Sequence, residues 1–513
     1  MPRYAAVDIG SNSVRLQVAE TVPSSNPDAA PPRILATERE VTRLGESVFR
    51  QGRVSPQAIE ETCGVLSRMA RIYEKYNVAG IRAVATSAIR DSGNQDEFLA
   101  RASEAIGTPV EIISGVEESR LIHLGVQSRW PQKNRKLVIV DIGGGSAEIV
   151  LSEEGRMAAA FSKPLGAVRL TEVFIKNDPP TERELHRLDE FIAAKIASAV
   201  RRVGAVKVDR AIATSATAAA VVCAINRVPR SERENADRLR ATAPQINKLF
   251  RAISTQNAAA RRKIPGIGPR RAEIIVAGLA VLRRILQDLG LPSVHYSSAG
   301  VRDGIIADLA ARGVGRDLSR PSPEQRRAVE ELARRFGVPL AHARKVADMA
   351  HILFDSLHAI HKLPADFGKL LHAAAVLHDV GHYVSDTRHH KHSFYVIDNS
   401  DLPGFTDRER HLIAHLCRYH RKSMPTPLHS SFQSLPAEDR RSVVYLIPLL
   451  RLADALDRSR RQLIEGMECR LRNGDIQIRL RSEMDPDLEI WAGERVTDAF
   501  QEVYGQRLVL VKS

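Results

Sequence analysis

The chain has 513 residues, of which 43% are hydrophobic and 27% are charged, a composition typical of globular proteins. This length is too great for one hydrophobic core, so we expect about three or four domains. The 75 Lys and Arg residues outnumber the 61 Asp and Glu residues, and the net charge of +14 favours an anionic partner such as nucleic acid, a polyphosphate or an acidic membrane surface.

Targeting segments and cysteine sites are not expected. The chain passes from Met1-Pro2-Arg3 directly into a strand-like segment without the apolar core of a signal peptide, and no uncharged run approaches the roughly 20 residues of a membrane span. We therefore predict a cytoplasmic protein. The cysteines never form a C-x-x-C pair, so neither a disulfide framework nor a structural zinc site is predicted: Cys63, Cys223, Cys417 and Cys469.

The first part of the chain alternates strands and helices. Residues 4–20 alternate as a first strand, and a turn-rich segment from Pro23 to Pro32 leads to a second strand at 34–40, so we expect a hairpin with a long tip. Helical spacing over 56–76 and a short buried strand at 80–86 follow. This alternation predicts an α/β layer fold.

One motif occurs twice, as Asp8-Ile9-Gly10-Ser11-Asn12-Ser13 and as Asp141-Ile142-Gly143-Gly144-Gly145-Ser146. In each copy an apolar strand ends in Asp before a small-residue turn, which leaves N–H groups for phosphate beside a carboxylate for a metal. The surroundings of the second copy repeat the plan, with a strand at 137–141, a hairpin at 147–152, a helix at 181–203, a strand at 210–213 and a helix near 270–288. The sequence thus indicates a duplicated phosphate-handling fold.

The last third of the chain differs in character. Glycine and proline interrupt the charged segment from Arg312 to Pro323, and residues 324–462 then show almost wholly helical spacing. Strands at 468–472 and 476–480 flank Asn473-Gly474, a strong hairpin signal, before a helix near 493–504 and a strand at 507–511. We predict four domains, at residues 1–130, 131–312, 320–462 and 463–513.

The residue types of the first half suit the cleavage of a phosphoanhydride, which requires stabilisation of phosphate oxygens and a base that orients water. Asp8 and Asp141 can hold a metal, and Glu148 lies on the same strand face as Ser146. A third small hydroxylated loop with Ser215 and Thr217 precedes a helix, as in phosphate sites at helix N-termini. The candidate phosphate-binding residues are Ser11, Asn12, Ser13, Gly143, Gly144, Gly145, Ser146, Ser215 and Thr217.

Between the two copies, a strand enters a glycine turn at Ser114-Gly115, and Glu117 and Glu118 open a helix. Acidic residues at a helix start also complement the helix dipole, so a purely structural role stays open at this point.

Four segments together resemble the exopolyphosphatase and guanosine pentaphosphate phosphohydrolase (Ppx/GppA) family: DIGSNS with Arg15, DIGGGS with Glu148, SGVEESRLI, and ATSAIR at 85–90. The resemblance continues through residues 270–273 and 298–304 and covers roughly 1–310. It implies an α/β protein of two actin-like (ribonuclease H-like) ATPase-fold lobes, followed by an all-α HD-like domain and a small C-terminal α/β unit.

The resemblance also implies roles for individual residues. Glu118, rather than Glu117, would act as the base for the attacking water, and Arg90 would bind the terminal phosphate. Asp141 and Glu148, with Asp8, would hold Mg²⁺ or another divalent cation. The substrate would be inorganic polyphosphate or guanosine pentaphosphate, between which the sequence does not decide, and the assembly would be a homodimer. Ala216 departs from the glycine usual in the third loop, which puts close backbone approach to phosphate there in doubt.

In the helical region, His342, His378, Asp379 and Asp454 resemble the metal ligands of the HD phosphohydrolase superfamily, with His382, His411 and His415 as further candidates. The alternative is an HD-like domain that no longer holds metal and helps to bind polymer. Basic clusters beside this pattern resemble polyphosphate contacts of the family: Lys391, His392, Arg418, Arg421 and Lys422.

Two other classes remain as alternatives. Residues 264–272 have the form of a helix-hairpin-helix DNA-binding hairpin, although we do not expect nucleic acid or a membrane as the main partner. A kinase or ATPase of the same fold would need an adenosine pocket and a phosphate acceptor, and the turn that carries Glu118 argues against it.

Overall fold

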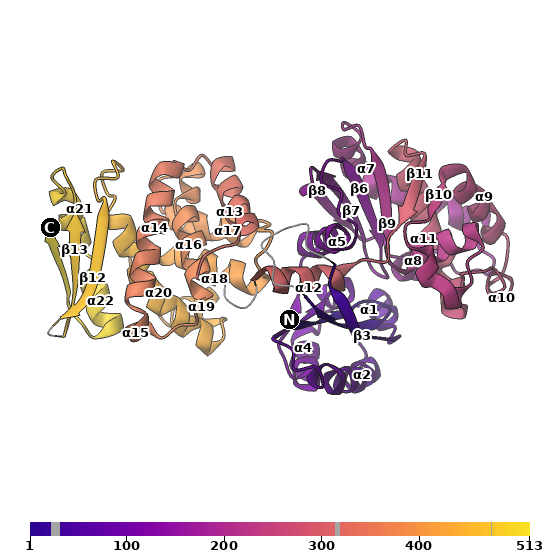
Figure 1. Cartoon of the computed structure of the whole chain (residues 1–513), viewed down its shortest axis with the longest axis horizontal. Coiled ribbons are helices and arrows are strands. Elements are labelled where there is room, and N and C mark those ends of the chain that lie inside the picture. Colours follow the sequence, from indigo (N-terminus) through magenta and orange to yellow (C-terminus); the bar gives the residue numbers. More distant parts are fainter. Residues whose placement is uncertain (22–30, 313–318, 473, 513) are drawn as a thin grey trace. The chain divides into compact units, whose positions relative to one another are not determined.

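The computed structural model describes residues 1–21, 31–312, 319–472 and 474–512. The chain forms two compact units, Met1–Val314 and Gly315–Ser513 (Figure 1). Three predicted features lie outside the described residues: residues 23–30 of the hairpin tip, the interdomain glycines Gly313 and Gly315, and Asn473 of the C-terminal turn.

The first sheet has the strand order β3-β2-β1-β4-β5. Residues 4–20, which we predicted as one strand, form two antiparallel strands, so that prediction was wrong. The chain reverses because the N–H of Gly10 donates to the carbonyl of Ser13 at 3.1 Å. The strands are β1 (Arg3–Ile9), β2 (Val14–Glu20), β3 (Arg33–Glu40), β4 (Gly80–Ala85) and β5 (Val110–Ile112).

The second sheet has the order β10-β11-β9-β6-β7-β8 and repeats the plan of the first. Strand β6 pairs antiparallel with β7 and parallel with β9, just as β1 pairs with β2 and β4. The duplication that the motif indicates is therefore present in the topology. The strands are β6 (Leu137–Ile142), β7 (Ala147–Glu153), β8 (Arg156–Lys163), β9 (Arg210–Thr214), β10 (Arg240–Thr242) and β11 (Ser293–Tyr296).

Amphipathic helices cover these sheets. On the first sheet lie α1 (Leu44–Gln51), α2 (Pro56–Glu74), α3 (Ser87–Arg90) and α4 (Gln95–Ile106). The second lobe contains α6 (Ala167–Phe174), α7 (Glu182–Val203), α8 (Ser215–Asn226), η1 (Arg230–Ala236), α9 (Ala243–Ser254), α10 (Ala258–Arg261) and α11 (Pro269–Asp288). Helix α7 begins where a capping box at Thr181 and Glu184 satisfies its first N–H groups.

Helices α5 (Gly115–Arg129) and α12 (Val301–Arg312) lie between the two sheets (Figure 1). Leu121 of α5 packs with residues of the first sheet, whereas Ile122 packs with residues of the second. The two helices cross closely, because a Cβ atom on Gly304 would lie 1.8 Å from the carbonyl oxygen of Leu121. This close crossing fixes the start of α5, where the predicted base lies.

The second unit is helical as predicted and ends in a three-stranded sheet of order β12-β13-β14. Its helices are α13 (Pro323–Arg335), α14 (Leu340–Ser356), α15 (His358–His361), α16 (Phe367–Leu377), η2 (Val380–Tyr383), α17 (His389–Asp398), α18 (Asp407–Tyr419), α19 (Ser430–Gln433) and α20 (Ala437–Ala455). The sheet comprises β12 (Gly466–Arg472), β13 (Asp475–Arg481) and β14 (Leu508–Lys512).

The C-terminal helix predicted near 493–504 is preceded by a separate short helix. Helix α21 (Asp487–Glu494) ends just after Gly493, which weakens a helix, and α22 (Thr497–Tyr504) then begins. Gly493 also lets α21 approach the sheet, since a Cβ atom there would lie 2.6 Å from Leu510 Cδ1. None of the helices in the described part of the chain has both the length and the apolar composition that a membrane crossing requires.

Candidate active site

The two copies of the Asp-Ile-Gly motif form the same turn and face each other. The N–H of Gly143 donates to the carbonyl of Ser146 at 3.0 Å, as Gly10 does to Ser13 in the first copy. The second loop can approach the first only because it consists of glycines: a Cβ atom on Gly145 would lie 2.7 Å from Ser11 Oγ. The backbones of both loops are therefore close enough to surround one small anion.

A cavity of about 70 Å³ lies where the loops meet, and it brings together most of the predicted site. Glu118 lines it together with Asp8 and Asp141. The predicted phosphate-binding residues on its wall are Ser11, Asn12, Ser13, Gly143, Gly144, Gly145, Ser146 and Ser215. Arg90, Glu148 and Thr217 are not on this wall, and their positions are described below.

The second lobe places two carboxylates side by side. Asp141 on β6 and Glu148 on β7 are direct cross-strand partners, an arrangement that is repulsive unless a cation or proton intervenes. Glu148 Oε1 accepts a hydrogen bond from Ser162 at 2.8 Å, while its buried Oε2 has no hydrogen-bond partner among the residues that the structure describes. Burial, with the charges of Glu118 and Asp141, raises the pKa of Glu148 well above its usual value. Burial likewise raises the pKa of Asp141.

The first lobe differs at the equivalent position. There Asp8 is paired across the strands with Arg15, a cation, rather than with a second carboxylate. Burial raises the pKa of Asp8, and the guanidinium groups of Arg15 and Arg302 oppose this rise. A divalent cation would therefore be held mainly by the second lobe.

The start of α5 assigns different surroundings to its two adjacent carboxylates. Ser114 caps the helix by accepting the N–H of Glu117 at 3.2 Å. The Glu117 carboxylate accepts two hydrogen bonds from Arg120, at 2.7 and 2.9 Å, and one from Arg82 at 3.2 Å. Both guanidinium groups also bind Asp308, on α12. Glu117 is thus part of a buried ion-pair network, whereas Glu118 lines the cavity.

Glu118 is a buried carboxylate beside one cation. Arg90 Nη1 lies 3.4 Å from Glu118 Oε2 and donates to the carbonyl of Ile113 at 2.6 Å, and these two contacts hold the guanidinium beside Glu118. Burial raises the pKa of Glu118 to about 7, against the attraction of Arg90 and with the repulsion of Asp8 and Asp141. A carboxylate with this pKa can take and return a proton near neutral pH.

The third loop supports the second one. Ser215 Oγ and Thr217 Oγ1 both donate to the carbonyl of Ile142, at 2.8 and 3.1 Å. Ser215 adopts a left-handed conformation, with φ of 65°, and still reaches the cavity wall. Thr217 lies behind that wall, where it accepts a hydrogen bond from Arg271 at 3.4 Å.

A second cavity, of about 300 Å³, adjoins the first and shares Asn12, Ala216 and Arg271 with it. Arginines dominate its wall: Arg39, Arg230, Arg233, Arg270 and Arg271. Partial burial and the neighbouring guanidinium groups of Arg39, Arg233 and Arg15 lower the pKa of Arg271 to about 9. Such crowding of like charges favours a polyanion in this cavity.

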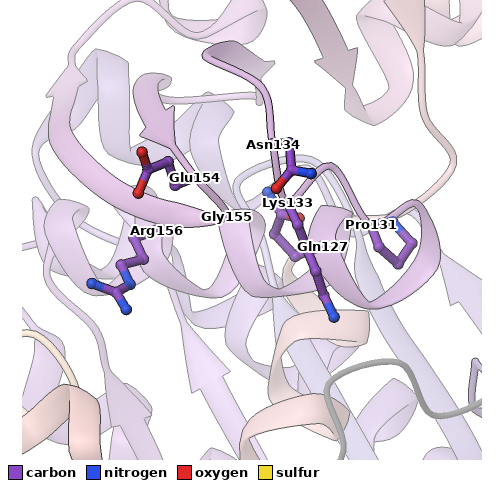
Figure 2. Close-up of a pocket in the computed structure, with 7 residues that line it drawn as sticks. All are labelled: Gln127, Pro131, Lys133, Asn134, Glu154, Gly155 and Arg156. Atoms are coloured by element: carbon purple, nitrogen blue, oxygen red, sulfur yellow. The ribbon is translucent and has the colours of Figure 1, made fainter.

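None of these arginines was predicted as a site residue, because they come from separate elements of the chain. The segment that resembles a DNA-binding hairpin contributes Gly266, Gly268 and Pro269 to the same wall. A further cavity, of about 620 Å³, lies between the end of α5 and the β7–β8 turn (Figure 2). Its lining residues include none of the predicted site residues: Gln127, Pro131, Lys133, Asn134, Glu154, Gly155 and Arg156.

The second unit brings together the four residues of the HD pattern. The Nε2 atoms of His342 and His378 each lie 3.4 Å from Asp454 Oδ1, and His378 Nε2 lies 3.6 Å from Asp379 Oδ1. His382 joins this cluster, with its Nε2 3.4 Å from Asp379 Oδ1.

The other two histidine candidates lie elsewhere in this unit. His411 pairs with Asp398, and His415 packs against Phe394 and Phe432.

The predicted polyphosphate contacts lie on or beside α17 and α18. Lys391, Arg421 and Lys422 are exposed, and His392 and Arg418 are half-buried. The guanidinium of Arg418 lies over the Phe394 ring at 5.6 Å. Their role in binding polyphosphate stays a prediction.

Comparisons with known proteins indicate the same family that the sequence motifs resemble. Residues 21–312 match the model of the Ppx/GppA phosphatase family, and residues 325–488 match Ppx/GppA phosphatase, domain III. Exopolyphosphatase 1 of Mycobacterium leprae (strain TN) is 30% identical over 305 residues, which are 59% of this chain and 88% of that protein.

Solved structures resemble the first unit. The Aquifex aeolicus PPX-GPPA enzyme is 30% identical with a TM-score of 0.52, over 60% of this chain and 99% of that one. An exopolyphosphatase from Cytophaga hutchinsonii, 21% identical with a TM-score of 0.55 over 60% of this chain and 97% of that one, shares the fold. These likenesses confirm the predicted α/β fold of two actin-like lobes. The helices and strands of the second unit show the predicted helical region and the small C-terminal α/β unit.

Proposed function

Because this chain belongs to the Ppx/GppA phosphatase family and is a phosphohydrolase, we propose that it releases terminal orthophosphate from inorganic polyphosphate. The observation that carries the proposal is the junction of two cavities. The smaller, of about 70 Å³, has room for little more than one phosphoryl group beside Glu118, and the adjoining one, of about 300 Å³, is lined by arginines. A terminal phosphate at the carboxylates and a polyanionic remainder among guanidinium groups would fit this arrangement.

The cofactor that we propose is Mg²⁺ or another divalent cation. The fit rests on the paired carboxylates of Asp141 and Glu148 and on the buried Glu148 Oε2, which has no hydrogen-bond partner within the described residues. Hard oxygen ligands of this kind suit Mg²⁺. Asp8 would complete the set from the first lobe. When bound, the cation would neutralise charge on the phosphate oxygens.

The protein's own groups would carry out the proton transfer and the positioning. Glu118 would accept a proton from the attacking water, whose oxygen forms a bond to the terminal phosphorus while the bridging P–O bond breaks. Glu118 could return the proton to the leaving oxygen or to solvent, since its pKa is raised to about 7. The N–H groups of the two glycine loops would hold the equatorial oxygens, and Arg90 would stabilise the transferred phosphoryl group.

Guanosine pentaphosphate is the second candidate substrate, because its 5′ γ-phosphate presents the same anhydride to the smaller cavity. The resemblance also supports two further proposals, a homodimeric assembly and polyphosphate contacts at Lys391, His392, Arg418, Arg421 and Lys422 in the second unit.

The test is a phosphate-release assay on long polyphosphate, short polyphosphate, guanosine pentaphosphate and ATP at equal concentrations of terminal phosphate. Turnover that is fastest on polyphosphate supports the proposal, and preference for guanosine pentaphosphate selects the second candidate. Phosphate transfer from ATP to an acceptor, without release, would instead identify a kinase. Light scattering coupled to size exclusion measures the assembly.

A further inference from the structure

One arginine of the second lobe, Arg169, contacts both the second glycine loop (residues 143–146) and the first lobe. It is the third residue of α6, and its Nε donates to the carbonyl of Gly145 at 2.7 Å. Its Nη2 donates to Ser87 Oγ at 3.2 Å and pairs with the carboxylate of Asp91. Gly145 and Ser87 both line the smaller cavity. Arg169 therefore joins the two lobes directly beside the proposed site of the terminal phosphate.

The start of α6 holds the carbonyl groups of this loop. The N–H of Ala167 donates to the carbonyl of Gly143 at 2.9 Å, and the N–H groups of the next two residues donate to the carbonyl of Gly144 at 2.9 and 3.1 Å. The carbonyl of Gly145 is held instead by the side chain of Arg169. Three consecutive carbonyl groups of the loop are thus bound by residues of α6.

These contacts set the direction of the loop's N–H groups. The peptide bonds of the loop are trans, so each N–H points opposite to the carbonyl of the same peptide unit. The N–H groups of Gly144, Gly145 and Ser146 are therefore directed away from α6, and these three residues line the smaller cavity. The N–H of Ser146 depends on Arg169, because it shares a peptide unit with the carbonyl of Gly145.

Arg169 also holds the helix that carries Arg90. Helix α3 begins at Ser87 and ends at Arg90, and Asp91 caps it. The guanidinium of Arg169 contacts the first residue of this helix and the residue that caps its end. One side chain of the second lobe thus contacts both the glycine loop and the short helix that presents Arg90.

The guanidinium of Arg169 is fixed by the fold. Its central carbon lies 4.1 Å from the centroid of the Phe49 ring, on α1, and its side chain is only 20% exposed. A planar guanidinium offers several N–H donors in fixed directions, so it can bind a carbonyl, a hydroxyl and a carboxylate together. The ammonium group of a lysine lacks this planar fork. The contacts therefore require arginine at this position rather than a positive charge alone.

We propose that Arg169 is a positioning residue of the phosphohydrolase reaction. It aligns the N–H of Ser146 and the guanidinium of Arg90 on one phosphoryl group, which it does not itself contact. This inference rests on the proposed function. Donors that are held in place before the reaction stabilise the charge that develops on the phosphoryl oxygens, so their misalignment lowers the rate of the chemical step.

The expected kinetic effect is a loss of kcat rather than a rise in KM. Among the residues that the structure describes, neither Arg169 nor its side-chain partners lie on the wall of the arginine-lined cavity, which would hold the rest of the polyphosphate. Replacing Arg169 should therefore leave most of the substrate's contacts unchanged. A displacement of about 1 Å at the reacting group lowers turnover by about 100-fold.

The test compares phosphate release from long polyphosphate by the wild type and three variants. Arg169→Ala should lower kcat about 100-fold and change KM less than about threefold. Arg169→Lys keeps the charge without the planar fork, so it should lower kcat about tenfold. Arg50→Ala is the matched control, because the exposed Arg50–Glu172 pair also joins the first lobe to α6 but holds no carbonyl of the loop. Its kcat should stay within about twofold of wild type.

Orthovanadate gives a readout that does not require turnover, since its five-coordinate form resembles the transition state of phosphoryl transfer. Its affinity, measured by calorimetry with Mg²⁺ present, should fall at least about tenfold in Arg169→Ala and stay within about twofold in Arg50→Ala. If the wild type releases no phosphate from polyphosphate, the proposed substrate is wrong, and the vanadate affinities alone decide the role of Arg169.

Three results would overturn the role of Arg169. They are a kcat of folded Arg169→Ala within about threefold of wild type, a loss of kcat in Arg50→Ala as large as in Arg169→Ala, and equal vanadate affinities of the wild type and Arg169→Ala. Circular dichroism checks that each variant is folded. If Arg169→Ala does not fold, the same comparisons are made with Arg169→Lys.

Discussion

Replacing Glu118 by Gln tests whether this carboxylate acts as the base. Glutamine keeps the volume of the side chain and an oxygen that can accept from Arg90, which lies 3.4 Å from Glu118 Oε2. It cannot accept the proton of the attacking water. Loss of general base catalysis lowers turnover by about 10²- to 10⁴-fold, which is roughly 3–5 kcal/mol of barrier at about 1.4 kcal/mol per tenfold change. The change should fall on kcat in a phosphate-release assay, with polyphosphate affinity altered less than about threefold.

The neighbouring Glu117→Gln variant is the matched control, because it removes the same group one residue away. Its carboxylate pairs with Arg120 and Arg82, which are buried. Breaking such a buried pair costs about 3–5 kcal/mol of unfolding free energy. We therefore expect a lower melting temperature, with kcat of the folded enzyme close to wild type. Glu118 is not the base if Glu118→Gln retains more than about a tenth of wild-type kcat, or if folded Glu117→Gln loses as much kcat as Glu118→Gln.

The structure supports three further predictions. The pKa of Glu118 is raised to about 7, so kcat/KM should rise with pH through about 7. Because this pKa is higher in the folded chain than in the unfolded chain, the ionised Glu118 carboxylate destabilises the fold increasingly as the pH rises towards about 7. In EDTA, Glu118→Gln should therefore raise the melting temperature more at pH 8 than at pH 5. An equal rise at both pH values would contradict the shift. Gly304→Ala should lower the free energy of unfolding by about 1–3 kcal/mol, because its Cβ would overpack against Leu121, and it should also lower kcat. Gly300→Ala, whose Cβ meets nothing within 4 Å, should change neither the stability in a denaturation assay nor kcat in a turnover assay. Arg271→Ala should raise KM for polyphosphate and weaken its salt dependence, unlike Arg187→Ala on the exposed surface of α7; equal effects would argue against the arginine-lined cavity.

Local features of the sequence were predictable because their causes are local. The turn at Gly10–Ser13 is set by a hydrogen bond that spans three residues, and the same is true of Gly143–Ser146, so the duplicated motif indicated both turns. The prediction of one strand over residues 4–20 was wrong because the alternation of apolar and polar residues continues through the turn at Gly10–Ser13, where the chain reverses.

Tertiary contacts were not predictable in this way. The arginines of the second cavity come from β3, η1 and α11, and no pattern within those elements distinguishes them from other surface arginines. The difference between Glu117 and Glu118 likewise depends on Arg82 and Asp308, far along the chain, so the choice of Glu118 came from the family resemblance alone.

The histidines of the second unit illustrate the same limit. His378 and Asp379 are adjacent in the sequence, so the HD pattern was visible there. His389 and His420 lie beside the predicted basic clusters in the sequence and were not among the predicted metal ligands, because the sequence does not show which ring nitrogen is held and where the other points. In the structure the carbonyl of Cys417 holds Nδ1 of His420, and its Nε2 faces His389. The direction of the ring nitrogen, rather than local charge, distinguishes a candidate ligand from a surface histidine.

The residue two positions after each copy of the motif differs between the lobes, and from this difference we infer a division of labour. In the second copy Asp141 lies opposite Glu148, and this pair of carboxylates needs a cation to be stable in its ionised form. In the first copy Asp8 lies opposite Arg15, whose guanidinium opposes the rise in the pKa of Asp8 that burial causes. A symmetric pair of carboxylate sites would bind two cations tightly and hold the lobes apart by repulsion when empty. From this asymmetry we propose that the second lobe holds the cation, while the first lobe contributes backbone N–H groups and a guanidinium to the phosphate oxygens.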